Sequence, residues 1–325
     1  MDPTLLDQIT NLIEGARRVL LVCHVAPDGD AIGSVLGMAF LLREQGKELT
    51  LACEDPVPEL YTWLPGSGDI VQEVRGPHDL VVSLDCSDER RMGSVFHDGL
   101  AGIPLLNIDH HVTNTLFGTV NWVDPSSVAT TQMILKLADA LGWALSPPVA
   151  DCLLTGLVTD TRSFRTYNVD VEAMRAVVRL MEAGAALNEI ARQTLDQRPL
   201  ASVLLWGQAI DRLQTDGEVL WTEVTHAMRE RWDLGEDGDS GLANFLSGVR
   251  DAKAVVVFTE RDNGTVDVGM RSVPGYDVAK VAYRLGGGGH PQAAGCTLEG
   301  SLAAIKARVL DEVRRGLVEA PAEGT

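Results

Sequence analysis

Cysteine is scarce in this chain of 325 residues, and its five cysteines show no paired spacing. None of them form a C-x-x-C pair, which argues against a thiolate zinc site, and their odd number argues against a disulfide framework. Cys23, Cys53 and Cys86 lie in apolar stretches. We therefore expect small, buried thiols in a reducing compartment.

Long apolar runs are also missing from the sequence. The longest ones, such as Val19 to Val25, have the length of a strand and meet charged residues within a few positions, so none is expected to cross a bilayer. The segment MDPTLLDQITNLIEGARR has the pattern of an acidic amphipathic helix rather than a basic, apolar signal peptide. The sequence thus predicts a cytoplasmic protein that binds no membrane.

An excess of positive charge is the third absence, because the formal net charge is −19 at pH 7. A protein that binds long duplex DNA usually presents a basic stripe that displaces counterions. Any nucleic-acid substrate is therefore expected to be short, or to be held by a few local cations. The simpler interpretation is that the negative charge serves solubility alone.

Strand-like and helical segments alternate along the chain, which predicts an α/β fold. A largely parallel, doubly wound sheet domain is expected over residues 1–185, a helical connector over 186–213, and a smaller α/β domain over 214–318. The tail 319–325 is expected to be disordered, and the active site to lie in the interdomain cleft. Strands are predicted at 17–25, 48–53, 79–87, 103–111, 218–225, 253–261 and 265–273, and helices at 30–46, 129–142, 149–161, 171–195, 240–249, 276–285 and 301–317.

Acidic and histidine residues gather where four of these segments end. In an open parallel sheet the carboxyl ends of the strands meet at one edge, and ligands bind there. A single motif of this kind is usually a polar loop or a helix cap, but four in succession point to chemistry. The residues concerned are His24, Asp28 and Asp30 after the first strand, Asp85 after the third, Asp109, His110 and His111 after the fourth, and Asp160 at a helix end.

So many carboxylates at one edge would repel one another unless cations neutralise them. Carboxylate oxygen mixed with imidazole suits Mn²⁺, and also Zn²⁺ or Mg²⁺. The ligands are too numerous for one ion and suit a pair that activates water for attack on phosphorus. Asp85 stands alone after a central strand and is the expected bridge between the two ions. Gly29 and Gly33 are expected to let the loop and the helix start approach the ions.

Four segments, HVAPDGDAIGS, SLDCSD, NIDHH and GLVTDTRSF, resemble the motifs of the DHH phosphoesterase family. GGGGHPQAAG, residues 286–295, is similar to the signature of the DHH-associated C-terminal domain. The resemblance spans residues 10 to 315. A pair of these domains without an added module looks most like the NrnA-type oligoribonucleases, which are also described as pAp phosphatases.

The resemblance implies a role for each motif residue. His24, Asp28 and Asp85 would hold one ion, while Asp30, Asp85, His110 and Asp160 would hold the other, with the division between ions left open. Asp109 would orient a neighbouring histidine. His111 would contact the scissile phosphate and stabilise its developing charge.

The second domain is expected to bind the substrate. The glycines of GGGGHPQAAG, among them Gly287, Gly288 and Gly289, would leave N–H groups open to an anion. His290 would donate to a phosphate or stack on a base, and Arg271 would pair with a phosphate. Arg165 and Arg198 are further candidates, each equally well explained as a surface cation.

The expected reaction is hydrolysis of very short RNAs, of about two to five nucleotides, to 5′-mononucleotides, with activity on pAp. One alternative is a RecJ-like exonuclease of single-stranded DNA, which would carry an added oligonucleotide-binding module. Another is a phosphodiesterase of linear or cyclic dinucleotides. A third is a nucleotide-binding regulator with an inactive metal site, which the intact motifs oppose. The helices between Val171 and Leu195 could support a homodimer.

Overall fold

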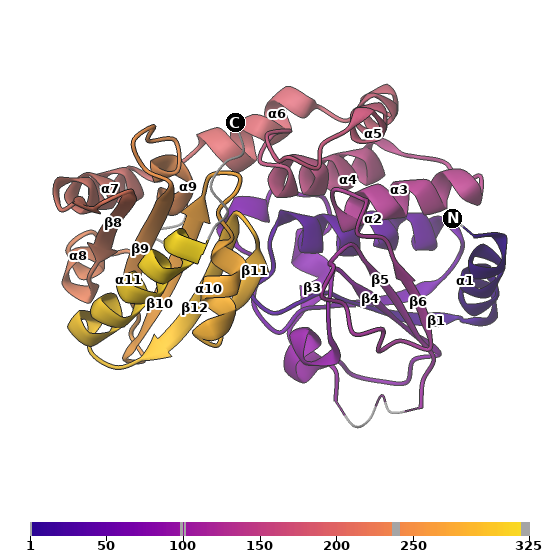
Figure 1. Cartoon of the computed structure of the whole chain (residues 1–325). Coiled ribbons are helices and arrows are strands. Elements are labelled where there is room, and N and C mark those ends of the chain that lie inside the picture. Colours follow the sequence, from indigo (N-terminus) through magenta and orange to yellow (C-terminus); the bar gives the residue numbers. More distant parts are fainter. Residues whose placement is uncertain (1, 98–99, 101, 236–240, 320–325) are drawn as a thin grey trace. The chain divides into compact units, whose positions relative to one another are not determined.

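The computed structural model describes residues 2–97, 100, 102–235 and 241–319 (Figure 1). The chain divides into two compact units, Met1–Gln197 and Arg198–Thr325. The division falls inside the stretch predicted as a helical connector, so part of that stretch packs with each unit. The expected α/β class is confirmed in both units.

In the part of the first unit that the structure describes, six strands form one sheet in the order β3-β2-β1-β4-β5-β6. All of its neighbouring strands run parallel. The order reverses between β1 and β4, and such a switch point is where doubly wound sheets bind ligands. The strands are β1 (Arg18–Val22), β2 (Glu48–Ala52), β3 (Ile70–Val71), β4 (Leu80–Leu84), β5 (Leu105–Asp109) and β6 (Val120–Val123).

Helices cover one face of this sheet, and their apolar side chains form the main core with it. The central helix α2 is enclosed on almost every side, which agrees with its nearly unbroken apolar sequence. The helices are α1 (Pro3–Gly15), α2 (Gly29–Glu44), α3 (Thr130–Ala140), α4 (Pro147–Asp160), α5 (Val171–Glu182) and α6 (Leu187–Ala191), with short turns η1 (Glu59–Tyr61), η2 (Ser67–Asp69), η3 (Glu89–Val95) and η5 (Arg192–Asp196).

The other face of the sheet has a smaller core, in which side chains of η3 replace a full helix. Met92 and Val95 from this turn pack against Leu20, Val22 and Val81 of the sheet. The turn also supports the loop after β1, because Val25 N donates a hydrogen bond of 2.8 Å to the carbonyl oxygen of Arg91. The segment that leaves β4 therefore buttresses the segment that leaves β1.

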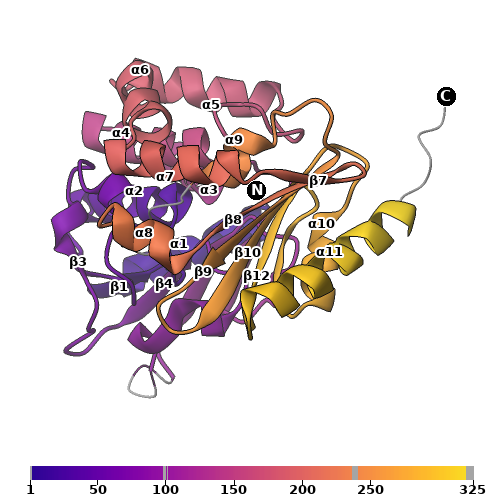
Figure 2. The ribbon, with the colours of Figure 1, turned by 90° about the vertical axis from the view of Figure 1, so that its left-hand side faces the viewer.

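In the described part of the second unit, six strands form a mixed sheet in the order β11-β12-β10-β9-β8-β7. Helices α10 and α11 pack on one face of the sheet, and α7, α8 and α9 contribute to a core on the other face (Figure 2). The strands are β7 (Gln214–Asp216), β8 (Val219–Val224), β9 (Ala254–Glu260), β10 (Thr265–Ser272), β11 (Gly288–His290) and β12 (Ala293–Glu299), and the helices α7 (Leu200–Asp211), α8 (His226–Arg231), α9 (Leu242–Leu246), α10 (Val278–Arg284) and α11 (Leu302–Glu319).

The glycine-rich segment departs from its expected conformation. We expected a loop of open N–H groups, but Gly288–His290 forms the edge strand β11, which pairs antiparallel with β12. A Cβ on Gly287 would lie 2.1 Å from the carbonyl oxygen of Gly295, so that glycine permits close approach of two backbones. An edge strand still directs alternate N–H groups away from its partner, so an anion can be bound there.

Other outcomes concern the ends of the chain and the membrane. None of the helices in the described residues has the length and apolar content needed to cross a membrane, as expected. The tail predicted to be disordered, 319–325, lies outside the described residues except for Glu319, which ends α11.

Candidate metal centre

The candidate site lies at the switch point of the first sheet. His24 follows β1, Asp85 follows β4 directly, and Asp109 ends β5. The backbone of Asp85 has a φ of 62°, in the left-handed region that residues with a side chain rarely adopt. Strained backbone of this kind is often found at functional sites, and here it turns the chain immediately after the central strand.

His24 faces two carboxylates from one ring nitrogen. Its Nε2 lies 3.8 Å from Oδ1 of Asp28 and 3.5 Å from Oδ2 of Asp85. The other ring nitrogen, Nδ1, lies 2.8 Å from the carbonyl oxygen of Val25. A proton on Nδ1 would satisfy that carbonyl and leave the Nε2 lone pair directed at the cluster.

Asp28 and Asp30 are placed by the start of α2. The side chain of Asp28 caps this helix by accepting from the N–H groups of Asp30 and Ala31, at 3.0 Å each. Asp30 is almost fully buried and caps a different helix, since it accepts from the N–H groups of Thr130 and Thr131 at 2.6 and 3.0 Å. The two aspartates of the D-x-D pattern thus organise two helix starts.

His110 joins the cluster from the end of β5, and Asp160 joins it from the last residue of α4, as the sequence predicts. Nε2 of His110 lies 3.7 Å from Asp85, 4.0 Å from Asp30 and 3.6 Å from Asp160. The packing of α4 against α2 fixes the place of Asp160. Gly33 allows that packing, because a Cβ there would lie 2.5 Å from the carbonyl oxygen of Cys152.

The expected reason for Gly29 and Gly33 is therefore corrected. We expected these glycines to let the loop and the helix start approach the ions and the substrate, but both face α4. A Cβ on Gly29 would lie 2.4 Å from the hydroxyl oxygen of Thr159. The glycines bring two helices together and so act on the site through the position of Asp160.

His111 is oriented by Asp109. Its Nδ1 lies 2.7 Å from Oδ1 of the fully buried Asp109 and 3.6 Å from Oδ1 of Asp85. Asn114 donates to the second oxygen of Asp109 at 2.6 Å. The carboxylate is thus held between two partners, and it fixes the ring of the histidine.

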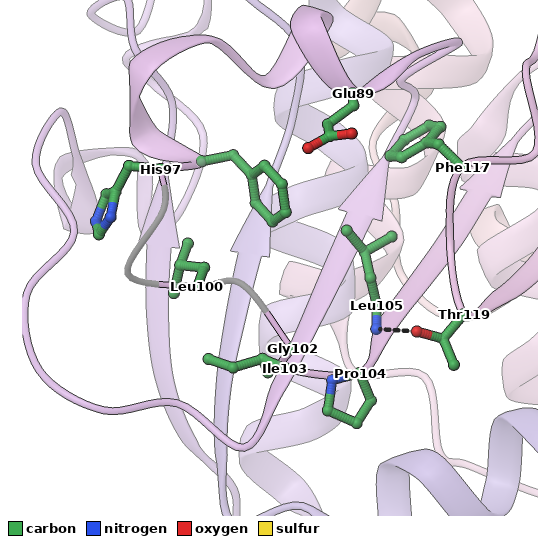
Figure 3. Close-up of a pocket in the computed structure, with 10 residues that line it drawn as sticks. Glu89, His97, Leu100, Gly102, Ile103, Pro104, Leu105, Phe117 and Thr119 are labelled. Atoms are coloured by element: carbon green, nitrogen blue, oxygen red, sulfur yellow. Dashed lines mark hydrogen bonds between the residues drawn. The ribbon is translucent and has the colours of Figure 1, made fainter.

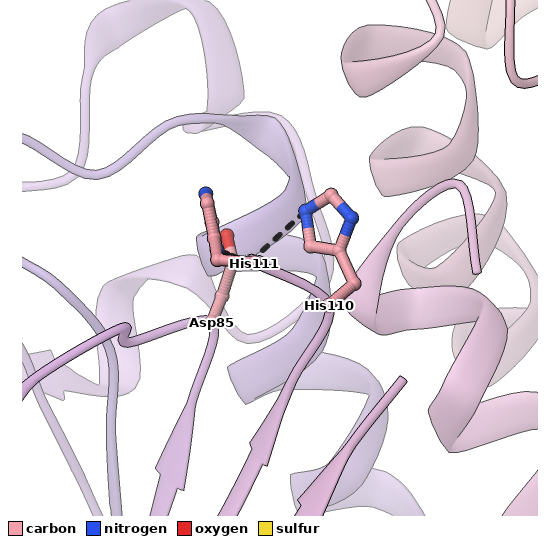
Figure 4. A group of neighbouring side chains, drawn as sticks. All are labelled: Asp85, His110 and His111. Carbon is pink, nitrogen blue, oxygen red and sulfur yellow. Dashed lines mark ion pairs between the residues drawn. The ribbon is translucent and has the colours of Figure 1, made fainter. Parts of the chain in front are cut away.

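The ligand atoms fall into three groups, each within 4.8 Å: His24 with Asp28 and Asp85, Asp30 with His110 and Asp160, and Asp85 with His110 and His111. Asp85 belongs to two groups, and its Oδ1 lies 3.7 Å from Nε2 of His110 and 3.6 Å from Nδ1 of His111 (Figure 4). The eight motif residues, far apart in the sequence, therefore meet in one place.

The protonation of these groups shows how strongly they interact. Burial, followed by the like charges of Asp28 and Asp85, raises the pKa of Asp160 to about 7. Burial and the charges of Asp85, Asp160 and Asp28 also raise the pKa of Asp30 well above its ordinary value. Burial would lower the pKa of His111, but the hydrogen bond to Asp109 and the charge of Asp85 raise it to about 9. The cluster thus holds protons that a cation would displace.

Divalent cations fit this set of donors. Asp30 and Asp85 are buried carboxylates, and the basic groups that lie near Asp30, Asp85 and Asp160 in the cluster are histidines. Mixed carboxylate and imidazole donors suit first-row divalent metals. Asp85 belongs to two ligand groups. Two neighbouring ions require a carboxylate of this kind, which can bind both of them.

Two threonines of this site escaped the sequence analysis. Thr130 donates from its hydroxyl to Oδ1 of Asp85 at 2.9 Å, and Thr131 donates from its hydroxyl to Oδ1 of Asp30 at 2.8 Å. A Thr-Thr pair at a helix start has no distinctive motif, and its partners lie 45 and 101 residues away. The only signal was that α3 begins without a capping side chain of its own, since Ala129 precedes it.

The loop after α4 carries Arg165 and a further cation that we had not singled out. Arg162, Ser163 and Phe164 all have a positive φ, between 51° and 63°. Burial and the nearby charge of Arg165 lower the pKa of the Arg162 guanidinium. Two cations are thus gathered in a strained turn that begins two residues after Asp160.

In the second unit, the structure brings Arg271 and His290 into one row of the sheet. Both pair in register with Ala293, Arg271 from β10 and His290 from β11. Nε of Arg271 also donates to Asn244 at 2.6 Å. Arg198 lies with its guanidinium carbon 4.8 Å from the centre of the Trp206 ring, so stacking accounts for at least part of its role.

A hollow of about 460 Å³ in the first unit is distinct from the cluster (Figure 3). None of the predicted site residues line it, and it touches the start of β5 rather than its end. Two of its lining residues are joined directly, because Leu105 N donates to the hydroxyl oxygen of Thr119 at 3.0 Å. Its lining residues are Glu89, Phe96, His97, Leu100, Gly102, Ile103, Pro104, Leu105, Phe117 and Thr119.

Models of two protein domains match the chain. The DHH family, N-terminal domain, matches residues 18–157, and the DHHA1 domain matches residues 225–317. The first match contains all the predicted cluster residues except Asp160, and the second contains Arg271 and His290. The resemblance inferred from the motifs is therefore confirmed.

Known proteins resemble the chain over nearly its whole length. It is 36% identical to the bifunctional oligoribonuclease and PAP phosphatase NrnA of Thermus thermophilus, covering 97% of this chain and 94% of that one. An exopolyphosphatase-related protein of Bacteroides fragilis shares the fold with a TM-score of 0.88 and 23% identity, covering 96% of each chain. RecJ of Thermus thermophilus, solved with Mn²⁺, has a TM-score of 0.58 at 17% identity, and 55% of that chain is covered.

Proposed function

Because the chain belongs to the DHH family, we propose that it is a metal-dependent phosphoesterase that hydrolyses very short oligoribonucleotides to 5′-mononucleotides and removes the 3′-phosphate of pAp. The observation that carries the proposal is the buried cluster in which Asp85 belongs to two ligand groups. The relative with 36% identity supports the choice of substrate through its name.

Two ions would be held in the division that the family resemblance implies. His24, Asp28 and Asp85 would hold one, and Asp30, Asp85, His110 and Asp160 the other. The first set is one of the ligand groups, and a second group contains Asp30, His110 and Asp160 but not Asp85. Mn²⁺ is our choice because the donors mix carboxylate and imidazole, with Mg²⁺ as the alternative. When bound, the ions would supply an acidified water and positive charge beside the phosphate.

The remaining side chains would orient and bind the phosphate. His111, held by Asp109, is placed to donate a hydrogen bond to the phosphate oxygen that gains charge. Arg165 and Arg162 offer positive charge next to Asp160. In the second unit, Arg271, His290 and the edge strand that contains Gly288 and Gly289 would bind a phosphate of the substrate.

The structure also bears on the RecJ-like alternative. The chain spans about half of that RecJ, so nearly half of the RecJ chain has no counterpart in the match. A long single strand is usually bound by a basic groove and aromatic platforms, and this chain has a net charge of −19. A short substrate therefore fits better than a long DNA strand.

The test is a time course with end-labelled RNA and DNA, from dinucleotides to twenty-mers, together with pAp, each in Mn²⁺ or Mg²⁺. We expect the shortest RNAs to yield 5′-mononucleotides fastest, and pAp to release phosphate. Preferential digestion of the long DNA strands would contradict the proposal in favour of the RecJ-like alternative. Cleavage of linear dinucleotides alone would point to a dinucleotide phosphodiesterase.

A further inference from the structure

The side chain of Asn114 lies at the centre of a hydrogen-bond network between two loops of the first unit. Its amide nitrogen donates to Oδ2 of Asp109 at 2.6 Å and to the carbonyl oxygen of Cys86 at 3.0 Å. Its Oδ1 accepts from the backbone N–H of Leu116 at 2.8 Å and from the side chain of the fully buried Asn107 at 3.2 Å. An amide group has two N–H donors and two lone pairs, and all four are used here.

The orientation of this amide follows from its partners. The backbone N–H of Leu116 can only donate, and the carbonyl oxygen of Cys86 can only accept. Oδ1 of Asn114 must therefore face Leu116, and its NH₂ group must face Cys86 and the carboxylate of Asp109. An aspartate at this position would have the same shape, but it would direct an oxygen at two acceptors.

Through Asp109, Asn114 reaches the histidine that would contact the phosphate. Oδ1 of Asp109 lies 2.7 Å from Nδ1 of His111, and Oδ2 accepts from Asn114. A carboxylate with a single partner can rotate about its bond to Cβ. Partners on both oxygens fix its plane, and with it the ring of the histidine.

Through Cys86, Asn114 reaches the turn that follows Asp85. Asp85 has a φ of 62°, and the carbonyl oxygen of the next residue accepts from Asn114. Beside this contact, the backbone N–H of Thr115 donates to the carbonyl oxygen of Ser87 at 2.9 Å. Backbone in the left-handed region persists only where surrounding contacts hold it. These two hydrogen bonds are contacts of that kind, and they join the loop after β5 to the segment after β4.

We propose that Asn114 is a positioning residue for two groups of the site at once. Through Asp109 it fixes the ring of His111, and through the turn after β4 it fixes the carboxylate of Asp85. Both groups serve the reacting phosphate rather than the rest of the substrate. Loss of Asn114 should therefore lower kcat more than it changes KM. The role in hydrolysis rests on the proposed function.

Steady-state kinetics with a labelled dinucleotide measure this effect. Asn114→Ala should lower kcat about 10- to 100-fold, as is typical when a partner of a site residue is lost, with little change in KM. Asn114→Asp removes the donors but keeps the shape, and it should lose at least as much. If Asn114→Asp keeps the wild-type kcat, the two donors are not needed and the proposal is wrong.

Asn121→Ala is the matched control. The amide of Asn121 donates to the carbonyl oxygens of Leu116 and Gly118 and accepts from the N–H of Gly118, so it also organises the loop after β5. This variant should keep kcat near the wild-type value. Equal losses of kcat in Asn114→Ala and Asn121→Ala would show that general disorder of the loop is the cause, and would overturn the positioning role.

A double-mutant cycle with His111→Ala shows whether Asn114 acts through the histidine. In the His111→Ala background, Asn114→Ala should lower kcat by a smaller factor than in the wild-type chain, because the ring that it places is gone. If the two losses multiply in full, Asn114 does not act through His111.

Titration with Mn²⁺, followed by calorimetry, tests the contact with the turn after Asp85 without hydrolysis. Asn114→Ala should weaken Mn²⁺ binding by about tenfold, while Asn121→Ala should bind Mn²⁺ like the wild-type chain. Unchanged affinity in Asn114→Ala would overturn the role towards Asp85. If circular dichroism shows that Asn114→Ala is misfolded, Asn114→Ser, which keeps a donor and an acceptor, takes its place.

These outcomes separate the inference from the proposed function. If the wild-type chain hydrolyses the dinucleotide while Asn114→Ala matches Asn121→Ala in kcat and in Mn²⁺ affinity, the phosphoesterase stands and the positioning role fails. If the wild-type chain hydrolyses no dinucleotide but Asn114→Ala alone loses Mn²⁺ affinity, Asn114 still places Asp85 and the proposed function fails. A wild-type chain that neither hydrolyses the dinucleotide nor binds Mn²⁺ would overturn both.

Discussion

The hydroxyl of Thr130 donates a hydrogen bond of 2.9 Å to Oδ1 of Asp85, and both residues are buried. The backbone N–H of the same threonine donates to Asp30 at 2.6 Å. One residue at the start of α3 therefore orients two carboxylates that come from different strands and helices. This contact gives the first prediction.

Replacing Thr130 with valine should weaken metal binding while the shape of the side chain is nearly conserved. Loss of a partner of this kind typically costs about 10- to 100-fold in metal affinity or activity. The measurement is titration with Mn²⁺ followed by calorimetry. Thr194→Val is the matched control, because its hydroxyl donates to the carbonyl oxygen of Ile190 within its own helix turn. Equal losses in both variants would show a general packing defect instead.

Replacing Asp85 with asparagine should abolish hydrolysis, by at least roughly a hundredfold, since this loss should exceed that of an outer partner. The buried carboxylate of Asp85 lies within 4 Å of His24, His110 and His111. The asparagine amide has no negative charge with which to neutralise two cations. The assay is release of mononucleotide from a labelled dinucleotide, with circular dichroism to verify folding. Asp79→Asn is the control at the other end of β4, where Asp79 pairs with Arg18 on the surface. Retained turnover in Asp85→Asn would remove the bridging role.

Metal binding should strengthen as pH rises through about 7. The pKa of Asp160 is raised to about 7 by burial and by the like charges of Asp28 and Asp85, so below that pH a cation must displace its proton. The apparent affinity for Mn²⁺ should therefore fall by up to about tenfold per pH unit below 7 for each proton displaced. Titrations at pH 6, 7 and 8 measure it, and equal affinities at all three would contradict the assignment.

The same group should make the metal-free protein less stable as pH rises. A carboxyl whose pKa is higher in the folded state binds more protons when folded, so the free energy of unfolding falls between about pH 4 and 7. Thermal unfolding without metal should show this trend, and Asp160→Asn should reduce it. An unchanged slope in the variant would mean that other groups cause the trend.

Gly33→Ala should destabilise the first unit and also weaken metal binding. The added methyl group would lie 2.5 Å from the carbonyl oxygen of Cys152, and overpacking of this kind costs about 1–3 kcal/mol. Because α4 carries Asp160, a shift of that helix also displaces a ligand. Gly15→Ala is the control, where a Cβ meets nothing within 4 Å, and the melting temperature should stay unchanged or rise. If Gly33→Ala is destabilised but binds the metal with normal affinity, Gly33 affects packing alone and does not set the position of Asp160.

The sequence predicted the first sheet and the cluster well because their signals are local. β-branched runs followed by charged residues identified β1, β4 and β5, and parallel pairing then placed His24, Asp85 and Asp109 at one edge. The two-residue strand β3 and the half-buried β6 were missed, because neither has an extended apolar run. The cytoplasmic location and the homodimer stay predictions.

The rest depended on contacts that no local pattern reveals. The glycine-rich segment was expected to be a loop, but residues Gly288–His290 pair with β12 as a strand. This pairing is possible because the glycines have no side chains that would separate the two backbones. Gly29 and Gly33 face α4 across a tight helix pair, and Thr130 reaches Asp85 from 45 residues away. Such contacts join residues that are far apart in the sequence, and a local sequence pattern does not predict them.

Asp30 caps α3 from a hundred residues earlier in the chain, and this has a consequence for the protein during its synthesis. Until Thr130 and Thr131 have left the ribosome, the nascent chain lacks the two N–H groups that donate to this carboxylate. It also lacks Asp160 until α4 is complete. The ligand set proposed for the second ion, Asp30, Asp85, His110 and Asp160, is therefore complete only once the helical layer of the first unit has been made.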